Sequence, residues 1–165
     1  MKIAENLELV FDKTQKLLIL REDGESKFEL KALSGQPAYQ ETSWHSGKSP
    51  IPSSIDVEGE TLYVWLKNPN QSGQKPDPRT GTGIGEFYYV SSRLSDKTRI
   101  WKYNYTAQRQ FIGIHPDNKY PGSAGCIVLQ HLKTEDEEKM IEFRNYIKNQ
   151  LVLQQNIDIL KLTVI

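Results

Sequence analysis

The first third of the chain alternates between apolar and polar residues, which is the pattern of β-strands with one buried face. Three such runs have their apolar positions at Leu7, Leu9 and Phe11, at Leu18 and Leu20, and at Phe28, Leu30 and Ala32. The pair Asp23-Gly24 separates the last two runs, and glycine accepts the positive φ that a tight hairpin turn requires. These features predict an antiparallel meander.

Two segments with many turn-forming residues, 34–54 and 68–85, interrupt this pattern. Long irregular stretches in a small domain are typically working loops or disordered segments. Residues 60–67, 87–90 and 99–103 return to strand composition, and their aromatic residues are typical of a half-buried pleated surface.

A helix is predicted after residue 133. Thr134 followed by Glu137 forms a capping box, and the acidic residues around it suit the positive end of a helix dipole, so we interpret them as a helix start and not as a metal site. The apolar residues that follow recur at spacings of three and four, at Met140, Phe143, Ile147 and Leu151. Residues 156–165 alternate again and predict a closing strand.

Length and charge narrow the classes of function. The 165 residues predict a single domain over residues 1–165, mainly β with one long C-terminal helix. The 21 basic and 21 acidic side chains cancel, so we expect no nucleic-acid binding. No apolar run exceeds five residues, far short of the ~18 that span a bilayer, so we expect no membrane insertion. Residues 1–6 lack the apolar core of a secretory signal.

The candidate chemistry lies in residues 111–129, which read as strand, loop and strand. Period two places Ile112 and Ile114 on one face of the first strand and His115 on the other; in the second strand Cys126 opposes Ile127. If the Ile faces enter the core, His115 and Cys126 emerge on the same side. The loop between them holds enough turn-forming residues to reverse the chain.

A cysteine beside a histidine suits nucleophilic catalysis. The thiolate is the nucleophile, and an imidazole lowers the thiol pKa or removes the proton during attack. The small residues 123–125 leave space for a substrate carbonyl, and the N–H groups of Gly125 and Cys126 are placed to stabilise an oxyanion.

Other interpretations stay open. The one cysteine in the chain rules out an intrachain disulfide, and a lone cysteine is often a small buried apolar residue. A metal site of His115, Asp117, Cys126 and His131 needs four ligands to converge without a close-spaced pair, so we expect no metal or cofactor. His131 is most simply solvated.

The segment resembles the active-site signature of the L,D-transpeptidase catalytic domain (YkuD-type). The matching residues are His115, then Ser123-Ala124-Gly125-Cys126, then the apolar strand 127–129. Residues 121–127 are most similar to a branch of small domains that includes interbacterial toxin effectors. Leu33-Ser34-Gly35 and Pro50-Ile51-Pro52-Ser53 also resemble family segments, so the likeness covers roughly residues 5–130 and is specific over 112–129.

The resemblance implies a β-sandwich or open barrel and cysteine acyl transfer on peptidoglycan stem peptides, as a transpeptidase or an L,D-carboxypeptidase. Cys126 would attack the carbonyl that follows the L-centre of a diamino acid and precedes a D-residue, with His115 as base and then acid. Two family positions differ, because the common second histidine is Ala124 and Val128 stands near a frequent arginine. A catalytically degenerate cell-wall-binding module is therefore the alternative.

Further residues are candidates for substrate contact, namely Ser123, Tyr120 and Trp44. Arg109 shares parity with His115 and suits a substrate carboxylate, but six residues along a straight strand separate them by about 20 Å. Because the substrate lies outside the cytoplasm, we expect delivery by a secretion system, release by lysis, or a trimmed leader. A delivery or immunity protein is a possible partner.

Overall fold

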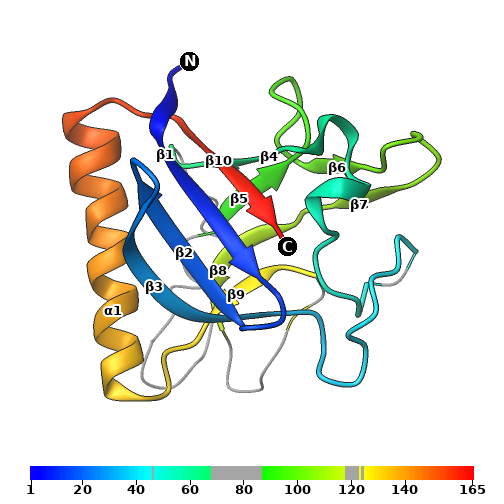
Figure 1. Ribbon diagram of the computed structural model, residues 1–165, viewed down its shortest axis with the longest axis horizontal. Helices are drawn as coiled ribbons and strands as arrows, with labels where there is room; N and C mark the ends of the chain where they lie inside the picture. The colour runs from blue at the N-terminus through cyan, green and yellow to red at the C-terminus, as the bar shows by residue number, and fades with distance from the viewer. Residues whose placement is uncertain (46, 68–86, 118–122, 124) are drawn as a thin grey trace.

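The computed structural model describes residues 1–45, 47–67, 87–117, 123 and 125–165 (Figure 1). Its strands are β1 (Ile3–Asp12), β2 (Leu17–Glu22), β3 (Glu25–Ser34), β4 (Leu62–Trp65), β5 (Tyr88–Ser91), β6 (Arg99–Trp101), β7 (Gln108–Gln110), β8 (Gly113–Pro116), β9 (Ile127–Leu129) and β10 (Ile159–Val164). Its helical segments are the short turns η1 (Ser54–Asp56) and η2 (Glu58–Glu60), then α1 (Thr134–Asn145) and the π-helical η3 (Tyr146–Gln154).

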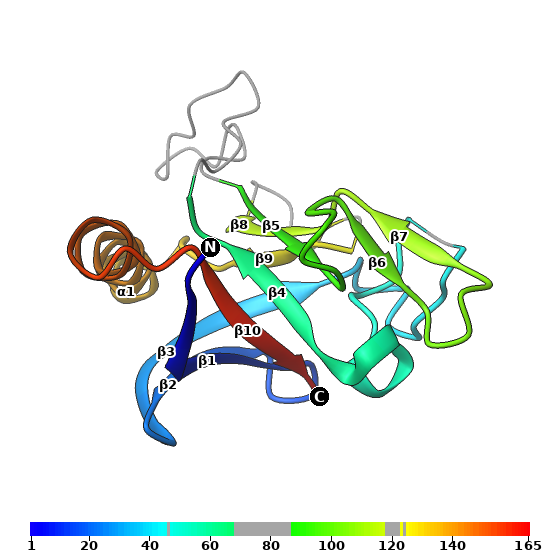
Figure 2. The same ribbon diagram turned by 90° about the horizontal axis from the view of Figure 1, so that it is seen from above.

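Eight of the strands in the described part of the chain close into a barrel, in the order β1-β10-β4-β5-β8-β9-β3-β2. The helix lies along one side of the barrel against β3, and β6 and β7 form a separate hairpin on the other side (Figures 1 and 2). The predicted class, mainly β with one long C-terminal helix, is confirmed. The eight strands close on themselves, and this barrel or sandwich agrees with the architecture that the resemblance implied.

The predicted meander is confirmed by antiparallel pairing of β1 with β2 and of β2 with β3. The hairpin turn is formed by Asp23 at φ 51° and Gly24 at φ 82°. Two successive positive φ values belong to the type I′ turn, whose twist matches that of the strands it joins. The Asp-Gly pair therefore determines this turn.

The alternating apolar residues fill the barrel. Leu9, Leu18 and Leu20 have no solvent exposure, and neither do Ile114 and Ile127 on the opposite wall. Each such side chain contributes about 1.5–3 kcal/mol through removal of its apolar surface from water. Packing of the two walls fixes which face of β8 and β9 points outward.

The first and last strands close the barrel side by side. β10 pairs in parallel with β1, where Leu9 lies opposite Leu162, and antiparallel with β4, where Leu162 lies opposite Leu62. The predicted closing strand is thus confirmed, and its two partners are strands far away in the sequence.

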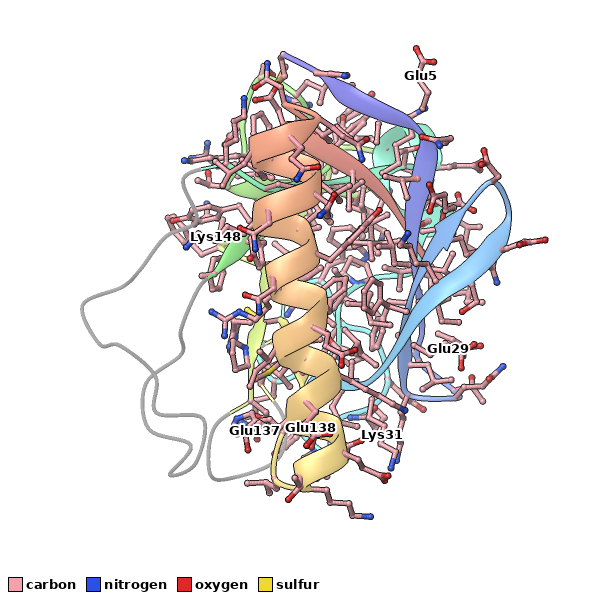
Figure 3. All side chains as sticks on the ribbon, turned by 90° about the vertical axis from the view of Figure 1, so that its left-hand side faces the viewer. Glu5, Glu29, Lys31, Glu137, Glu138 and Lys148 are labelled. Carbon is pink, nitrogen blue, oxygen red and sulfur yellow. The ribbon has the colours of Figure 1, made fainter. Side chains whose placement is uncertain are left out.

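The predicted helix begins at Thr134, and its apolar residues Met140, Phe143, Ile147 and Leu151 are buried. Phe143 meets Phe28 of β3 edge-to-face, with ring centroids 5.8 Å apart. Figure 3 looks onto the exposed side of the helix, which carries Glu138 and Lys148. None of the helices in the described residues is long and apolar enough to cross a membrane.

The predicted capping box is wrong. Thr134 is already the first helical residue, and the N-cap is Lys133, whose extended backbone (φ −87°, ψ 140°) carries no side-chain capping hydrogen bond. A lysine side chain has no acceptor for the free N–H groups of the first turn.

Candidate active site

The strands predicted around His115 and Cys126 are neighbours in the barrel. β8 pairs with β9 in parallel, with Ile114 opposite Ile127 and His115 opposite Val128. The prediction that the intervening loop reverses the chain is therefore wrong. β9 takes its direction from β3, its other neighbour, with which it pairs antiparallel.

His115 and Cys126 face outward on the same side of this sheet. Ile114 and Ile127 belong to the barrel core, whereas Cys126, the residue before β9, packs with Phe87, and the ring of Phe87 stacks on His115. The register puts Cys126 level with Gly113, two residues before His115, so their Cα atoms are separated by roughly 8 Å along the diagonal. Within the residues that the structure describes, no hydrogen bond joins the two side chains.

Cys126 is buried, with 9% of its surface exposed, in a small apolar cluster with Phe87 and Val128. Its sulfur lies 3.8 Å from the carbonyl oxygen of Phe111. Burial raises the pKa of the Cys126 thiol to about 11, while the Gly113 N–H and the charge of Arg109 act in the opposite direction. The side chain is therefore a protonated thiol at neutral pH.

The His115 ring is held from two sides. Its Nδ1 lies 2.7 Å from the carbonyl oxygen of Pro116, and the ring of Phe87 stacks on it at 5.5 Å between centroids. Because a carbonyl only accepts, we assign the proton of the neutral ring to Nδ1, which leaves a lone pair on Nε2. Burial lowers the pKa of His115, against the effects of the Pro116 carbonyl and of Asp117. A neutral imidazole with a free lone pair suits a general base.

The loop before β9 contains Ser123, Gly125 and Cys126 and is called the cysteine loop below. It is hydrogen-bonded to two upstream segments. The Ser34 hydroxyl donates to the Gly125 carbonyl at 3.1 Å and accepts from the Ile51 N–H at 2.8 Å. The N–H of Ser123 donates to the Gly35 carbonyl at 3.1 Å, and its hydroxyl donates to the Cys126 carbonyl at 2.6 Å. The segments 33–35 and 50–53 that carried part of the resemblance therefore meet at this loop.

Gly113 and Gly125 are required where they stand. A Cβ atom at Gly113 would clash with the ring of Phe87, and one at Gly125 would clash with Nη2 of Arg109. Gly125 also has a φ of 100°, which side chains rarely tolerate. Gly113 and Gly125 thus make room for protein side chains.

Arg109 lies beside the cysteine loop. The sequence did not predict this contact. Phe111 takes a φ of 53°, so the chain bends between β7 and β8 and the straight-strand estimate of about 20 Å does not apply. The Arg109 guanidinium donates to the carbonyls of Ser43, Ser49 and Pro50 at 3.1–3.2 Å. A positive φ at Phe111 has no sequence signal, so the bend was not foreseeable.

Two of the remaining candidates, Trp44 and Ser123, lie in the described part of the chain. Trp44 is half-buried and lines a pocket of about 330 Å³ with Arg109 and Ile112. Ser123 uses its polar groups within the loop, and the substrate contacts of Ser123 and Trp44 stay predictions. Tyr120 and Ala124 lie outside the described residues.

His131 was expected to be solvated, and this is wrong. It is buried, and its Nε2 lies 2.6 Å from the carbonyl oxygen of Asp117. The residue after β9 folds back under the end of β8, which removes it from water. In the described part of the chain, no group of three or more His, Cys, Asp and Glu residues is arranged to hold a metal ion.

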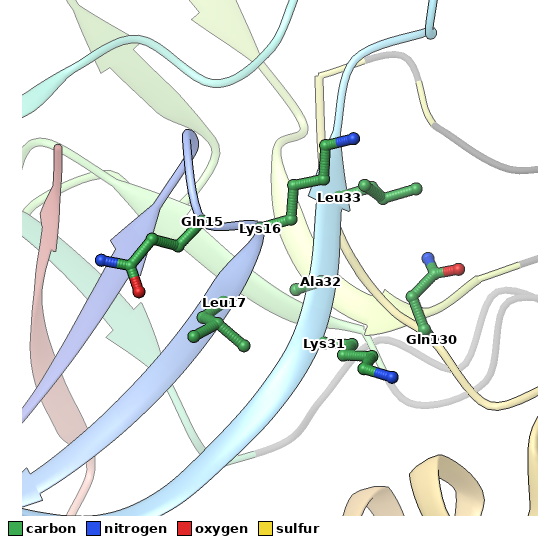
Figure 4. Close-up of a pocket in the computed structure, with 7 residues that line it drawn as sticks. All are labelled: Gln15, Lys16, Leu17, Lys31, Ala32, Leu33 and Gln130. Carbon is green, nitrogen blue, oxygen red and sulfur yellow. The ribbon is translucent and has the colours of Figure 1, made fainter.

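A second pocket, of about 530 Å³, adjoins this face of the sheet (Figure 4). Its lining residues come from the β1–β2 turn, β2, β3 and the end of β9, and they are Gln15, Lys16, Leu17, Lys31, Ala32, Leu33 and Gln130. Leu33 also packs against the cluster around Cys126. The outer face of the sheet therefore extends from Cys126 to a largely apolar pocket, which Lys16 and Lys31 also line.

Comparison with known proteins identifies the fold. No protein-family profile matches the sequence, and no curated protein matches it. Among solved structures, Bd1075 of Bdellovibrio bacteriovorus is 15% identical with a TM-score of 0.56, over 98% of this chain and 48% of the other. The Ldtfm–avibactam carbamoyl enzyme is 14% identical with a TM-score of 0.50, over 98% and 49%. A mutant L,D-transpeptidase of Enterococcus faecium is 14% identical with a TM-score of 0.49, over 98% and 50%.

The chain has the fold of L,D-transpeptidase catalytic domains of the YkuD type, as the resemblance implied. It spans 48% to 61% of the length of the solved chains it is similar to. At these identities the likeness concerns the fold, and the chemistry has to be argued from the residues.

Proposed function

Starting from this fold, we propose that the protein carries out cysteine-dependent acyl transfer on peptidoglycan stem peptides, as an L,D-transpeptidase or an L,D-carboxypeptidase. One observation carries the proposal: His115 of β8 and Cys126, the residue before β9, both pack against the ring of Phe87 outside the barrel core. The neutral imidazole, with its Nε2 lone pair, complements a thiol that must lose its proton to react.

In the proposed first step, Nε2 of His115 takes the thiol proton as the Cys126 sulfur attacks the carbonyl carbon of the donor bond. The carbonyl electrons move to oxygen, and the N–H groups of Gly125 and Cys126 stabilise this oxyanion. When the oxyanion collapses, the bond to the D-residue breaks and His115 gives its proton to the leaving amine. The products are a thioester on Cys126 and a free D-residue.

In the second step, His115 takes a proton from the acceptor as that acceptor attacks the thioester. An amine from another stem peptide gives a cross-link, and water gives a shortened peptide. The thiolate leaves and recovers its proton from His115. Access of amine or water to the thioester decides between the two reactions.

A second candidate is a cell-wall-binding module that keeps the fold without turnover. The burial of the Cys126 sulfur and its raised pKa favour it, because a buried apolar thiol is usually unreactive. Ala124 in place of the expected second histidine also favours it.

Incubation with purified muropeptides, followed by mass spectrometry, tests the proposal. We expect loss of a terminal D-alanine for a carboxypeptidase, or a peptide dimer for a transpeptidase. Cys126→Ala removes the nucleophile and should abolish either change. Val128→Ala is the matched control, since it truncates another buried side chain of the same cluster and leaves the thiol in place.

Turnover by Cys126→Ala would show that the nucleophile lies elsewhere. Muropeptides that bind to the parent protein without any change of mass would establish the binding module instead. The resemblance to small toxin effectors supports one further proposal, that the chain reaches its substrate through a secretion machine with a delivery or immunity partner. Release by lysis or a trimmed leader are the other routes.

A further inference from the structure

The Arg109 side chain places a buried positive charge beside the candidate site. The residue is 5% exposed, and its guanidinium is surrounded by neutral carbonyl groups of the 43–50 segment. In the residues that the structure describes, no carboxylate forms an ion pair with it. A buried charge without a counter-ion is strongly unfavourable, so a negative charge nearby would be stabilised.

That charge lies one residue from the sulfur-bearing position. Nη2 of Arg109 packs so closely on Gly125 that a Cβ atom there would clash with it. Gly125 precedes Cys126, and its N–H is one of the proposed oxyanion donors. The guanidinium therefore faces the place where both the thiolate and the oxyanion would form.

Few other charges act on this place. The titratable neighbour from β8 is His115, and Asp117 beyond it acts on His115. The apolar side chains around it are Phe87, just before β5, Val128 of β9 and Leu33 of β3, and β5 also contributes the phenol of Tyr89. Among these described residues, Arg109 of β7 provides the positive charge next to Cys126. This charge lowers the pKa of the thiol, whereas burial raises it.

The guanidinium is also fixed in position. It donates to three backbone carbonyls of the 43–50 segment, while the next N–H, that of Ile51, donates to Ser34, which donates to the Gly125 carbonyl. A charge held in place before the reaction needs no reorganisation when negative charge develops.

We propose that Arg109 is a positioning residue whose fixed positive charge stabilises the negative charge that develops at Cys126, first as a thiolate and then at the oxyanion beside Gly125. The oxyanion part rests on the proposed function. Stabilisation of the thiolate concerns the free protein and does not depend on the proposed function.

The test is alkylation of Cys126 by iodoacetamide between pH 6 and pH 11. In Arg109→Met, we expect labelling at pH 8 to slow roughly tenfold, because the thiolate loses its neighbouring charge and the thiolate fraction at this pH falls. Arg109→Lys keeps a charge and should restore most of the rate. Arg99→Met is the matched control, since this exposed arginine of β6 pairs with Asp96 and should label like the parent.

An unchanged profile in folded Arg109→Met would overturn the proposal. Equal slowing in Arg109→Met and Arg109→Lys would also overturn it, because it would reveal a structural clamp without an electrostatic effect.

A measurement on the parent protein keeps the test valid if the variants do not fold. Iodoacetate is anionic and iodoacetamide is neutral, so the ratio of their rates should be several-fold higher on native protein than on protein unfolded in urea. A ratio that is no higher in the native state contradicts the proposal. Labelling needs no substrate, so a protein that labels as expected but leaves muropeptides unchanged would refute the proposed function alone.

Discussion

At the scale of single residues, the site combines two groups that are both neutral at pH 7. Burial raises the pKa of Cys126 to about 11 and lowers that of His115, so an ion pair between them is disfavoured in the free protein. In the proposed mechanism, proton transfer therefore accompanies attack, with His115 as the general base. The sequence left open whether the imidazole lowers the thiol pKa or removes its proton, and the geometry favours removal.

The raised pKa of Cys126 predicts a loss of stability in alkali. The pKa of Cys126 is about 11 in the folded protein, against an ordinary 9.0 in the unfolded chain. The contribution of this thiol to the free energy of unfolding is therefore complete below pH 9 and is lost between pH 9 and pH 11. Its upper limit is about 2–3 kcal/mol. Urea unfolding of the parent and of Cys126→Ala at pH 7, 9 and 11 measures this. The parent should lose more stability than the variant, and parallel losses would contradict the burial of the thiol.

Period two in the sequence was enough to predict which residues of 112–115 and 126–129 face outward. It does not extend across Phe111, where a positive φ redirects the chain, and so it does not place Arg109. Nor does it report burial outside the strands, where His131 is covered by the end of β8. Residue faces are local properties, whereas these two contacts depend on tertiary packing.

At the scale of elements, the local sequence again predicts some features of the helix and not others. The apolar stripe follows from spacing alone, and all four of its residues are buried. The capping box fits the residue types, but the chain leaves the extended conformation at Lys133, one residue earlier than the motif requires. The direction of β9 is likewise set by β3, a partner that a local pattern does not reveal.

The vacant cap predicts that Lys133→Asp stabilises the protein. An aspartate at the N-cap accepts from a free N–H of the first turn and suits the positive end of the dipole, a gain of about 0.5–2 kcal/mol. Urea unfolding measures the difference. The control is Lys139→Asp, which makes the same charge change at an exposed position farther along α1 and should give no gain. Equal effects of the two substitutions would mean that net charge, not capping, is responsible.

At the scale of the whole molecule, β10 determines whether the barrel is closed. Leu162 is fully buried between Leu9 of β1 and Leu62 of β4. Leu162→Ala should therefore cost about 2–5 kcal/mol in unfolding free energy, since it leaves a cavity at the closing strand. Lys161→Ala, at the exposed neighbouring position, should cost little. A small effect of Leu162→Ala would show that the barrel does not depend on this closure.

The fold is retained at very low sequence identity. The structure of Bd1075 is matched at a TM-score of 0.56 with 15% identity, so few of the residues that build the barrel are shared. Many apolar combinations fill such a core equally well, provided that volume and alternation are kept.

Closure by the first and last strands also has a consequence during synthesis on the ribosome. Residues 159–164 follow the other described strands in the chain, so the edges of β1 and β4 that pair with β10 have no partner until residues 159–164 have been translated. Unpaired edges are where nascent chains associate with one another. We expect a nascent chain of this protein to need chaperone protection until β10 has been translated.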